Sequence, residues 1–534
     1  MAVINGGAGN NTLRGTTGAD TIGGHLGNDV LNGGRGNDRV DGGAGADILV
    51  WDQDPLSRGR LDVYLGGATE ERYDSNIYSA LSGGDRLVLN GSGAFRVGFT
   101  STENGTAHDA WGNQLNFVGI ERLQTGAGND RIIASNAVLN PGRGSGDSHT
   151  PTHGITVNSG AGRDYIVGSR GSDVLDPGAG NDTVYGGGGL DLLMPSEGND
   201  YGHAGAGDDN VRWGNNGSMG VIRNIGHDTL VGGDGFDLLN VWTKVSGDNS
   251  TGGTVVFTST SAGRASFPQG NGTLVFSQFE QFWTHEGKDT IAGGNAVVGA
   301  DGKGLHVNTR WGDDMITATR GHDTIEGGVG ADTIDGRQGN DIISMCDGVF
   351  EGRNAQPDAE RDVLIIRDGS GSDRILAFQA GDARGAGGSI TRHSDALNVS
   401  ALHDAQGNRV DVNDVRVTSQ NGDAVLTFPN GERIVLEGVD AGIMDRAMLI
   451  KLGIPAAGAA AGRMAAPETA EPAAAAAPAS RALPAAEADE FNWTAASPGA
   501  TGELRELVAT HDDQAARDLA PDAGAAPVND FDWG

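Results

Sequence analysis

The chain has 534 residues, of which 91 are glycine and one, Cys346, is cysteine. Its 71 acidic and 37 basic residues give a formal net charge of −34, which argues against nucleic acid or an anionic membrane surface as a partner and favours cation binding. The composition also excludes a disulfide framework and collagen, and no apolar run approaches the roughly 18 residues of a membrane span.

Residues 1–50 repeat a nine-residue frame, G-G-x-G-x-D-x-U-x, in which U is a large apolar residue. Gly33–Asp41 is a clean copy, whereas Asn11 replaces the aspartate of the first copy. The glycines permit the positive φ angles that a sharp turn needs, and the turn exposes carboxylate and carbonyl oxygens, the ligands that Ca²⁺ prefers. The x-U-x segment predicts a short strand whose middle side chain points inward. The inward residues expected to stack into a thin core are Ile22, Leu31, Val40 and Leu49.

The same aspartate returns in nine-residue register at residues 164–209, 228–237 and 314–341. A flexible Gly-rich linker would not keep an apolar residue two positions after each aspartate. The nonapeptide resembles the calcium-binding β-roll repeat of the RTX (repeats-in-toxin) family of secreted bacterial proteins. The resemblance implies a parallel β-roll with several bound Ca²⁺ ions, in which metal binding supplies folding free energy that the thin core lacks.

A longer module occurs twice in the middle of the chain. Phe99–Thr102 reappears as Phe257–Thr260, and each copy then carries a glutamate, Glu121 or Glu280, nine residues before an aspartate. This spacing indicates that the chain re-enters the solenoid before the aspartate ladder resumes. Alternating polar and apolar residues around these segments predict β-strands. We therefore expect one continuous β-solenoid with inserted strands or hairpins.

The ladder aspartates are the predicted metal ligands. They are Asp20, Asp29, Asp38, Asp47, Asp130, Asp164, Asp173, Asp182, Asp191, Asp209, Asp228, Asp237, Asp289, Asp314, Asp323, Asp332 and Asp341. Asp200 is left out because Gly202 stands where its repeat needs a core residue. Asp228 and Asp323 lack the leading double glycine, so they are doubtful ligands or mark places where the roll deforms.

In residues 346–454 the nonapeptide repeat gives way to segments whose sequence predicts β-strands. Residues 423–439 predict a hairpin around the turn Pro429–Gly431. A solenoid needs a cap on its terminal coil, because an open edge invites aggregation. This block resembles the C-terminal cap of RTX proteins.

From about residue 455 the chain is rich in alanine and proline, which predicts disorder. Two acidic-aromatic patches, Glu490–Trp493 and Asp530–Trp533, suggest short recognition elements, although an incidental tail is the alternative. We expect no N-terminal signal peptide, because the first repeat follows Met1 directly. The RTX resemblance implies export by type I secretion machinery, which reads an uncleaved C-terminal signal.

The expected fold class is all-β, a calcium-binding parallel β-roll or β-solenoid with inserted strands, a β-rich cap and a disordered tail. We expect five parts. They are an N-terminal roll (1–50), a first solenoid module (51–212), a duplicated second module (213–345), a C-terminal cap (346–454) and a tail with the secretion signal (455–534).

No catalytic motif is visible, neither H-E-x-x-H nor G-x-S-x-G. Ser148 with His149 and His153 is the only hint of nucleophile chemistry, and a polar surface loop or a weak transition-metal pair explains it as well. Cys346 has no catalytic motif around it, so we interpret it as a thiol without a catalytic role. We therefore favour a protein that is not an enzyme, and leave open a lyase or epimerase site on one solenoid face.

The favoured function is that of an extracellular, secreted calcium-binding protein with a structural or adhesive role on the cell surface or in a surface layer. The duplicated insertions, residues 85–125 and 241–285, are the expected contact surfaces for a cell-surface glycan or protein. Each carries a tryptophan, Trp111 or Trp283, which would suit such a contact unless both cap the core. The alternative is an extracellular polysaccharide-modifying enzyme. Membrane insertion is disfavoured because no apolar or amphipathic segment precedes the roll.

Overall fold

The structure is a computed structural model that describes residues 1–67, 84–139, 153–214, 225–241, 252–268, 272–346, 360–384 and 390–457. Within these ranges nearly all regular structure is β-strand, and the one α-helix is α1 (Arg446–Lys451). No helix among the described residues has the length and apolar character to cross a membrane. The predicted disordered tail with its two acidic-aromatic patches, and Ser148 with His149, lie outside the described residues.

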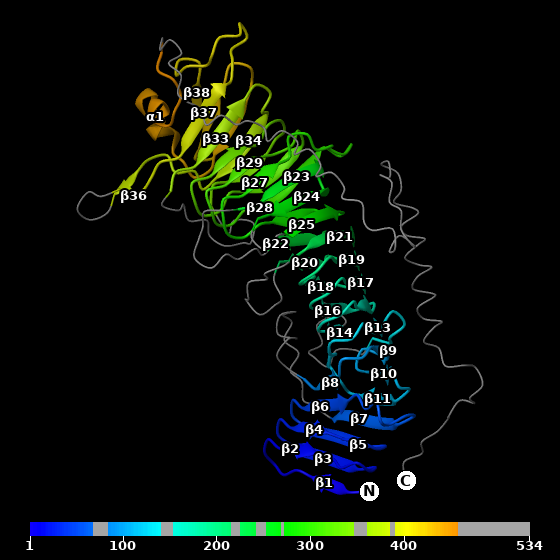
Figure 1. Cartoon of the computed structure of the whole chain (residues 1–534). Helices are drawn as coiled ribbons and strands as arrows, with labels where there is room; N and C mark the ends of the chain where they lie inside the picture. The colour runs from blue at the N-terminus through cyan, green and yellow to red at the C-terminus, as the bar shows by residue number, and fades with distance from the viewer. Residues whose placement is uncertain are drawn as a thin grey trace, which may run out of the picture.

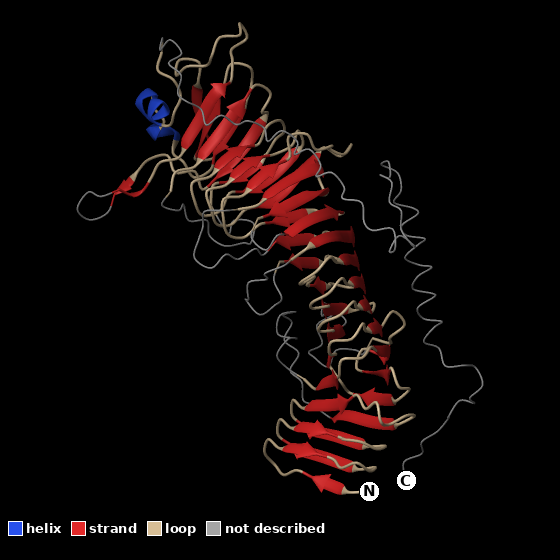
Figure 2. Cartoon of the chain, in the orientation of Figure 1, coloured by secondary structure: helices blue, strands red, loops and turns tan. Residues whose placement is uncertain are grey.

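The chain winds into a long stack of coils whose strands alternate between two sheets (Figures 1 and 2). In the first sheet Thr21 pairs with both Val3 and Arg39 in parallel register, and in the second sheet Val30 pairs with Thr12 and Ile48. Each step is 18 residues, so two nonapeptides make one coil. The predicted all-β parallel solenoid is confirmed.

The first sheet contains, in spatial order, β1 (Val3–Asn5), β3 (Thr21–Leu26), β5 (Arg39–Ala44), β7 (Leu61–Gly67), β11 (Gln114–Val118), β10 (Asn104–Asp109), β9 (Phe95–Ser101), β13 (Arg131–Ile133), β15 (Tyr165–Val167), β17 (Thr183–Gly188), β19 (Tyr201–Ala206), β21 (His227–Asp234), β25 (Gly272–Ser277), β24 (Ala262–Phe267), β23 (Thr254–Ser259), β27 (Thr290–Ala292), β29 (Met315–Thr317), β31 (Thr333–Asp335), β33 (Val363–Arg367) and β37 (Ala396–Ala401).

The second sheet contains β2 (Thr12–Arg14), β4 (Val30–Asn32), β6 (Ile48–Asp52), β8 (Arg86–Asn90), β12 (Arg122–Gln124), β14 (His153–Asn158), β16 (Ser172–Asp176), β18 (Leu192–Leu193), β20 (Asn210–Trp213), β22 (Leu238–Val241), β26 (Gln281–Trp283), β28 (Lys303–Asn308), β30 (His322–Glu326), β32 (Ile342–Ser344), β34 (Ser372–Leu376), β40 (Arg433–Leu436), β39 (Asp423–Thr427) and β38 (Arg416–Gln420).

The inserted strands predicted from the sequence lie in the first sheet. There β9, β10 and β11 form an antiparallel set, in which β11 pairs with the preceding β7 and β9 pairs with the following β13. The second insertion repeats this pattern: β25 pairs with β21, β24 lies between β25 and β23, and β23 pairs with β27. The two insertions therefore have the same strand order.

The core changes in width along the stack. In the N-terminal roll the four predicted inward residues, Ile22, Leu31, Val40 and Leu49, are fully buried, one from each strand. At the insertions the core fills with aromatic rings instead. Phe99 and Phe117 pack edge to face with ring centroids 5.4 Å apart, and Phe257 and Phe276 do the same at the same distance.

The C-terminal end of the solenoid is covered by added strands. The hairpin predicted around Pro429–Gly431 is present, because β39 pairs with β40 in antiparallel register. β40 also pairs in parallel with β34, so the hairpin extends the second sheet. A small pair, β35 (Ala383–Arg384) with β36 (Ile390–Arg392), and the helix α1 complete this end (Figure 2).

Candidate metal centres in the turns

The regular turns between strands, such as that of Asp47, are built around the first glycine of the nonapeptide. A Cβ on Gly42 would overlap both the carbonyl oxygen of Gly66, one coil further on, and Oδ2 of its own Asp47. The next residue, Gly43, has φ +102°, which an L side chain rarely adopts. Glycine is therefore needed because a carboxylate and a backbone carbonyl converge on the space beside the turn.

The ladder aspartates are linked from coil to coil by one of their two oxygens. The backbone N–H of Asp20 donates to Oδ1 of Asp38 at 2.8 Å, and that of Asp164 donates to Oδ1 of Asp182 at 2.7 Å. A second ladder runs along the other row of turns, where the backbone N–H of Asp191 donates to Oδ1 of Asp209 at 2.7 Å. These bonds fix each carboxylate and leave Oδ2 to face the turn.

In many turns Oδ2 is buried and accepts no hydrogen bond. This holds for Asp29, Asp38, Asp47, Asp182, Asp191, Asp200, Asp209, Asp237 and Asp341, which we call the open turns. A buried carboxylate oxygen without a partner costs free energy. A bound Ca²⁺ ion would supply the missing positive charge, and carboxylate and carbonyl oxygens are its usual ligands. The residues of the open turns therefore fit calcium.

The electrostatics of these turns point the same way. Burial raises the pKa of Asp38 to about 7, with a contribution from the neighbouring Asp62 carboxylate. Burial, followed by the nearby Asp373 and Asp323 carboxylates, raises the pKa of Asp341 to about 9. Carboxylates stacked every coil repel one another when ionised, so the ladder favours protons or cations.

Five ladder aspartates have both oxygens occupied by protein donors, and we call these the closed turns: Asp20, Asp62, Asp173, Asp228 and Asp323. In three of them a Ser or Thr four residues earlier donates its backbone N–H and its hydroxyl to the carboxylate, as Thr16 does to Asp20 at 2.6 and 2.7 Å. In the other two, the indole N–H of Trp51 or Trp213 donates to Oδ2 of Asp62 or Asp228 at 2.5 Å.

Four further turns are intermediate. A hydroxyl at the first frame position, from Thr125, Ser159, Thr284 or Thr309, lowers the pKa of the turn aspartate against the larger effect of burial. The aspartates of these turns are Asp130, Asp164, Asp289 and Asp314.

Three aspartates that the sequence prediction left out have the same place in the ladders as the predicted ligands. Asp200 was excluded because of Gly202, yet its Oδ2 is buried and open like those of the regular turns. Asp62 and Asp85 were missed, although the N–H groups of Asp38 and Asp47 donate to them at 2.7 Å. The signal that could have found them is a buried apolar residue two positions later, Tyr64 and Leu87.

Other candidate chemistry is sparse in the part of the chain that the structure describes. There, no three side chains of His, Cys, Asp and Glu lie close enough together to hold a metal ion, so a site in the turns has to combine carboxylates with backbone carbonyls. His153 begins β14, half-buried, and burial lowers its pKa. Cys346 is buried, with its thiol 3.8 Å from the Ser344 hydroxyl.

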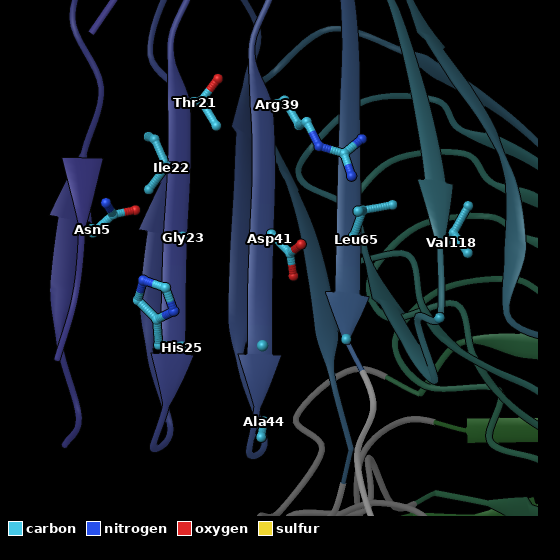
Figure 3. Close-up of a pocket in the computed structure, with 13 residues that line it drawn as sticks. Asn5, Thr21, Ile22, Gly23, His25, Arg39, Asp41, Ala44, Leu65 and Val118 are labelled. Carbon is cyan, nitrogen blue, oxygen red and sulfur yellow. The ribbon is translucent and has the colours of Figure 1, made fainter. Parts of the chain in front are cut away.

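A groove of about 700 Å³ lies on the outer face of the first sheet in the N-terminal roll (Figure 3). Asn5, Gly23, Asp41, Leu65 and Val118 form one cross-strand row in it. His25 and Arg39 line it on either side of that row. The groove is open, and mixes polar and apolar side chains.

Comparison with known proteins agrees with the turn geometry. A family model described as the RTX calcium-binding nonapeptide repeat (4 copies) matches residues 3–31, 15–49, 117–137, 158–193, 195–212, 224–240 and 309–343. No curated protein of similar sequence was found. Among solved structures, the extracellular lipase LipA from Serratia marcescens matches at 16% identity and a TM-score of 0.16, over 55% of this chain and 44% of that chain.

The matched segments contain open, intermediate and closed turns on both sides of each insertion, including the segment with Glu121 and Asp130. The chain therefore carries RTX calcium-binding nonapeptide repeats in several copies, and these repeats bind calcium.

Proposed function

We propose that this chain is a secreted calcium-dependent scaffold with a structural or adhesive role outside the cell, and that it has no catalytic activity of its own. The observation that carries the proposal is the row of open turns. Asp29, Asp38 and Asp47 each fix one carboxylate oxygen to the neighbouring coil and leave the other buried without a partner. A stack built in this way is incomplete until cations are present.

The open turns connect calcium to folding. In the thin parts of the stack each strand contributes one buried apolar side chain, such as Leu31 or Val40. Burying a side chain of this size contributes about 1.5–3 kcal/mol, which is of the order of the backbone entropy lost by one or two residues. The repeats therefore depend on binding energy from the metal, and calcium becomes the signal to fold.

Dependence on calcium suits a protein that acts outside the cell. Extracellular calcium modules bind at roughly 10⁻⁴ to 10⁻³ M, so the repeats would stay loose where calcium is scarce. We propose export by type I machinery, with the signal in the tail at residues 455–534, followed by folding outside. The roll (1–50), the two modules (51–212 and 213–345) and the cap (346–454) are the proposed domains.

The turns beside the second insertion, together with Trp283 of the insertion itself, offer a contact surface of suitable chemistry for a glycan or protein. The guanidinium of Arg310 lies 4.4 Å from the ring centroid of Trp283 and 6.0 Å from that of Trp311. Trp311 is 36% exposed and packs on His285 with ring centroids 4.8 Å apart. An exposed indole held by a cation and a second ring can stack on a sugar or an apolar side chain. In the first insertion Trp111 is half-buried.

The experiment is binding of the calcium-loaded chain to the surface of the producing cells and to a panel of purified acidic glycans. We expect retention that is lost on Trp311→Ala, while Val329→Ala, a change at a 41% exposed apolar residue of the neighbouring turn, leaves it intact. Equal retention of wild type and Trp311→Ala would remove this surface from the proposal. The alternative of a polysaccharide-modifying enzyme would place its chemistry in the groove with His25, Arg39 and Asp41.

A further inference from the structure

The geometry points to two kinds of coil with different needs for calcium. We infer that the closed turns bind no calcium, and that the coils bordering both insertions are held together by the chain's own donors, so that the insertions keep their fold when calcium is withdrawn. The inference rests on the proposed role of the open turns as the calcium-binding positions.

The first way of closing a turn uses a hydroxyl residue at the second frame position. In the open turns other than that of Asp200 this position has positive φ, for example +84° at Gly34 and +109° at Gly187. Before Asp200 the position is Ser196, whose hydroxyl donates to Asp176 and to the Met194 carbonyl and not to Asp200, so that turn stays open. Ser169 and Thr319 have a Cβ and do not adopt positive φ, so the turn takes another form. Their N–H groups donate to Oδ2 of Asp173 and Asp323 at 2.6 and 3.2 Å.

The hydroxyls complete this arrangement. Those of Ser169 and Thr319 donate to the same carboxylates at 2.9 Å and accept the N–H of the residue two positions later at 3.0 Å. The other oxygen of each carboxylate accepts a backbone N–H from the preceding coil, that of Ile155 or Leu305. Neither oxygen is left for a cation. Asp173 and Asp323 each follow an insertion, at equivalent places in the two modules.

The second way uses an indole. In the sequence, Trp51 lies four residues after Asp47, and Trp213 lies four residues after Asp209. Each tryptophan is fully buried and donates its N–H to Oδ2 of the last aspartate of one ladder before the insertion, Asp62 or Asp228. Oδ1 of these aspartates accepts the N–H of Asp38 or Asp200, as in the open turns.

In the first module the turn of Asp62 also contains a buried arginine side chain. Nε of Arg60 lies 2.7 Å from Oδ2 of Asp62, and both side chains are almost fully buried, at 2% and 1% exposed. The two terminal nitrogens of Arg60 donate to the carbonyl oxygens of Gly34 and Asp52 at 3.0 and 2.8 Å. One carboxylate and two backbone carbonyls are the same types of oxygen that surround calcium in proteins. Arg60 therefore takes the part of a resident cation.

The insertions replace the missing metal with hydrophobic contact. Trp51 packs on Phe95 with ring centroids 6.0 Å apart, and Trp213 packs on Phe267 at 5.5 Å. In the second insertion Phe276 also lies 5.2 Å from Phe282. Aromatic side chains bury more apolar surface than the single aliphatic residue per strand of the thin roll. The same tryptophans thus close the turns and begin the wider core.

The test compares matched aspartates in the full chain. Asp228→Asn and Asp323→Asn change closed turns. Asp237→Asn changes an open turn nine residues after Asp228 on the other ladder, and Asp341→Asn changes an open turn 18 residues after Asp323 on the same ladder. Bound calcium is counted by equilibrium dialysis with elemental analysis at saturating calcium. We expect the open-turn variants to lose bound calcium and the closed-turn variants to keep the wild-type number. Thr319→Gly, which restores the usual glycine, should add bound calcium.

Hydrogen exchange of the wild-type chain in chelator provides the second readout. Peptides from residues 95–118 and 254–277 should exchange at least tenfold more slowly than peptides from 21–44. Loss of calcium in the closed-turn variants, or equally fast exchange of all these peptides, would overturn the inference. If the open-turn variants also kept the wild-type number, the assignment of calcium to the open turns would fail instead, so the two failures are distinguishable.

Discussion

Asp29 and Asp47, one coil apart, are joined directly: the N–H of Asp29 donates to Oδ1 of Asp47 at 2.7 Å, while Oδ2 of Asp47 is buried without a partner. One residue thus supplies a structural bond with one oxygen and an open ligand position with the other. This division predicts how the chain responds to calcium, to substitution and to pH.

The open turns predict calcium-dependent folding. In chelator we expect most of the β signal in far-UV circular dichroism to disappear, with a remainder from the insertions. Millimolar Ca²⁺ should restore the signal and reduce the hydrodynamic radius, because the −34 net charge opposes compaction until cations bind. Equal β content and equal radius in both conditions would rule this out.

Removing one open-turn carboxylate should raise the calcium concentration needed for folding. We expect Asp38→Ala and Asp200→Ala to shift the calcium midpoint upward by similar factors, because Oδ2 is buried and open at both. The exposed Asp301, which lies outside the nonapeptide turns, is the matched control, and Asp301→Ala should leave the midpoint unchanged. The measurement is a calcium titration followed by circular dichroism. A shift for Asp38 alone would mean that the repeat with Gly202 does not bind.

Stability in chelator should fall as pH rises. Burial raises the pKa values of Asp38, Asp182 and Asp200 in the folded chain to about 7, above the ordinary value of 3.8. The folded chain then holds more protons than the unfolded chain, so stability is fully present below about pH 4 and is lost as pH rises to about 7. Far-UV circular dichroism in chelator at pH 5 and pH 7.5 tests the sign, and we expect more β signal at pH 5. With calcium present the trend should reverse, because ionised carboxylates bind the cation better.

The tail should be needed for export. Deleting residues 455–534 should trap the protein inside the producing cell, whereas a deletion within the first roll, which leaves the tail in place, should still be exported. Immunoblots of cell and medium fractions measure the distribution. Secretion of the truncated chain would show that the export signal lies elsewhere.

The scaffold proposal predicts no turnover. The calcium-loaded chain should not process alginate, pectin, other acidic glycans, peptides or esters above the rate of a blank. Reproducible turnover that disappears in His25→Ala or Asp41→Ala would place a catalytic site in the groove of Figure 3 and favour the enzyme alternative. Turnover lost in His153→Ala would point instead to the start of β14.

Periodicity was sufficient to predict the coils. A nine-residue repeat fixes which side chains point inward, so Ile22 and Leu31 could be placed in the core before the fold was known. The spacing from Glu121 to the next aspartate was also informative. Oε2 of Glu121 accepts the N–H of Asp85, and Glu280 does the same for Asp237, so both glutamates end a ladder where an aspartate would otherwise stand.

The closed turns could not be read from the repeat. Trp51 and Asp62 are 11 residues apart and contact only because the chain turns between β6 and β7. Both ladders also continue into the cap. There the backbone N–H of Asp332 donates to Oδ1 of Asp362, and that of Asp341 donates to Oδ1 of Asp373. Those aspartates lie 30 and 32 residues on, so the interrupted register conceals them from a search for period nine.

The insertions have a geometric consequence for the whole molecule. Between β7 and β13 the first sheet holds three strands, whereas the second sheet holds only β12 between β8 and β14. Neighbouring strands are about 4.8 Å apart, so one side of the solenoid becomes longer than the other by roughly 10 Å at each insertion. The axis has to curve there with the first sheet on its convex side, and Figure 1 shows the stack changing direction near β23–β25.

The length of the solenoid and its curvature are therefore set by different parts of this chain. The number of nonapeptides between the insertions sets how far apart the two bends lie, at about 4.8 Å for each added pair. The insertions set the bend itself. Gain or loss of repeats can lengthen or shorten such a protein without altering the angle at which it presents its ends.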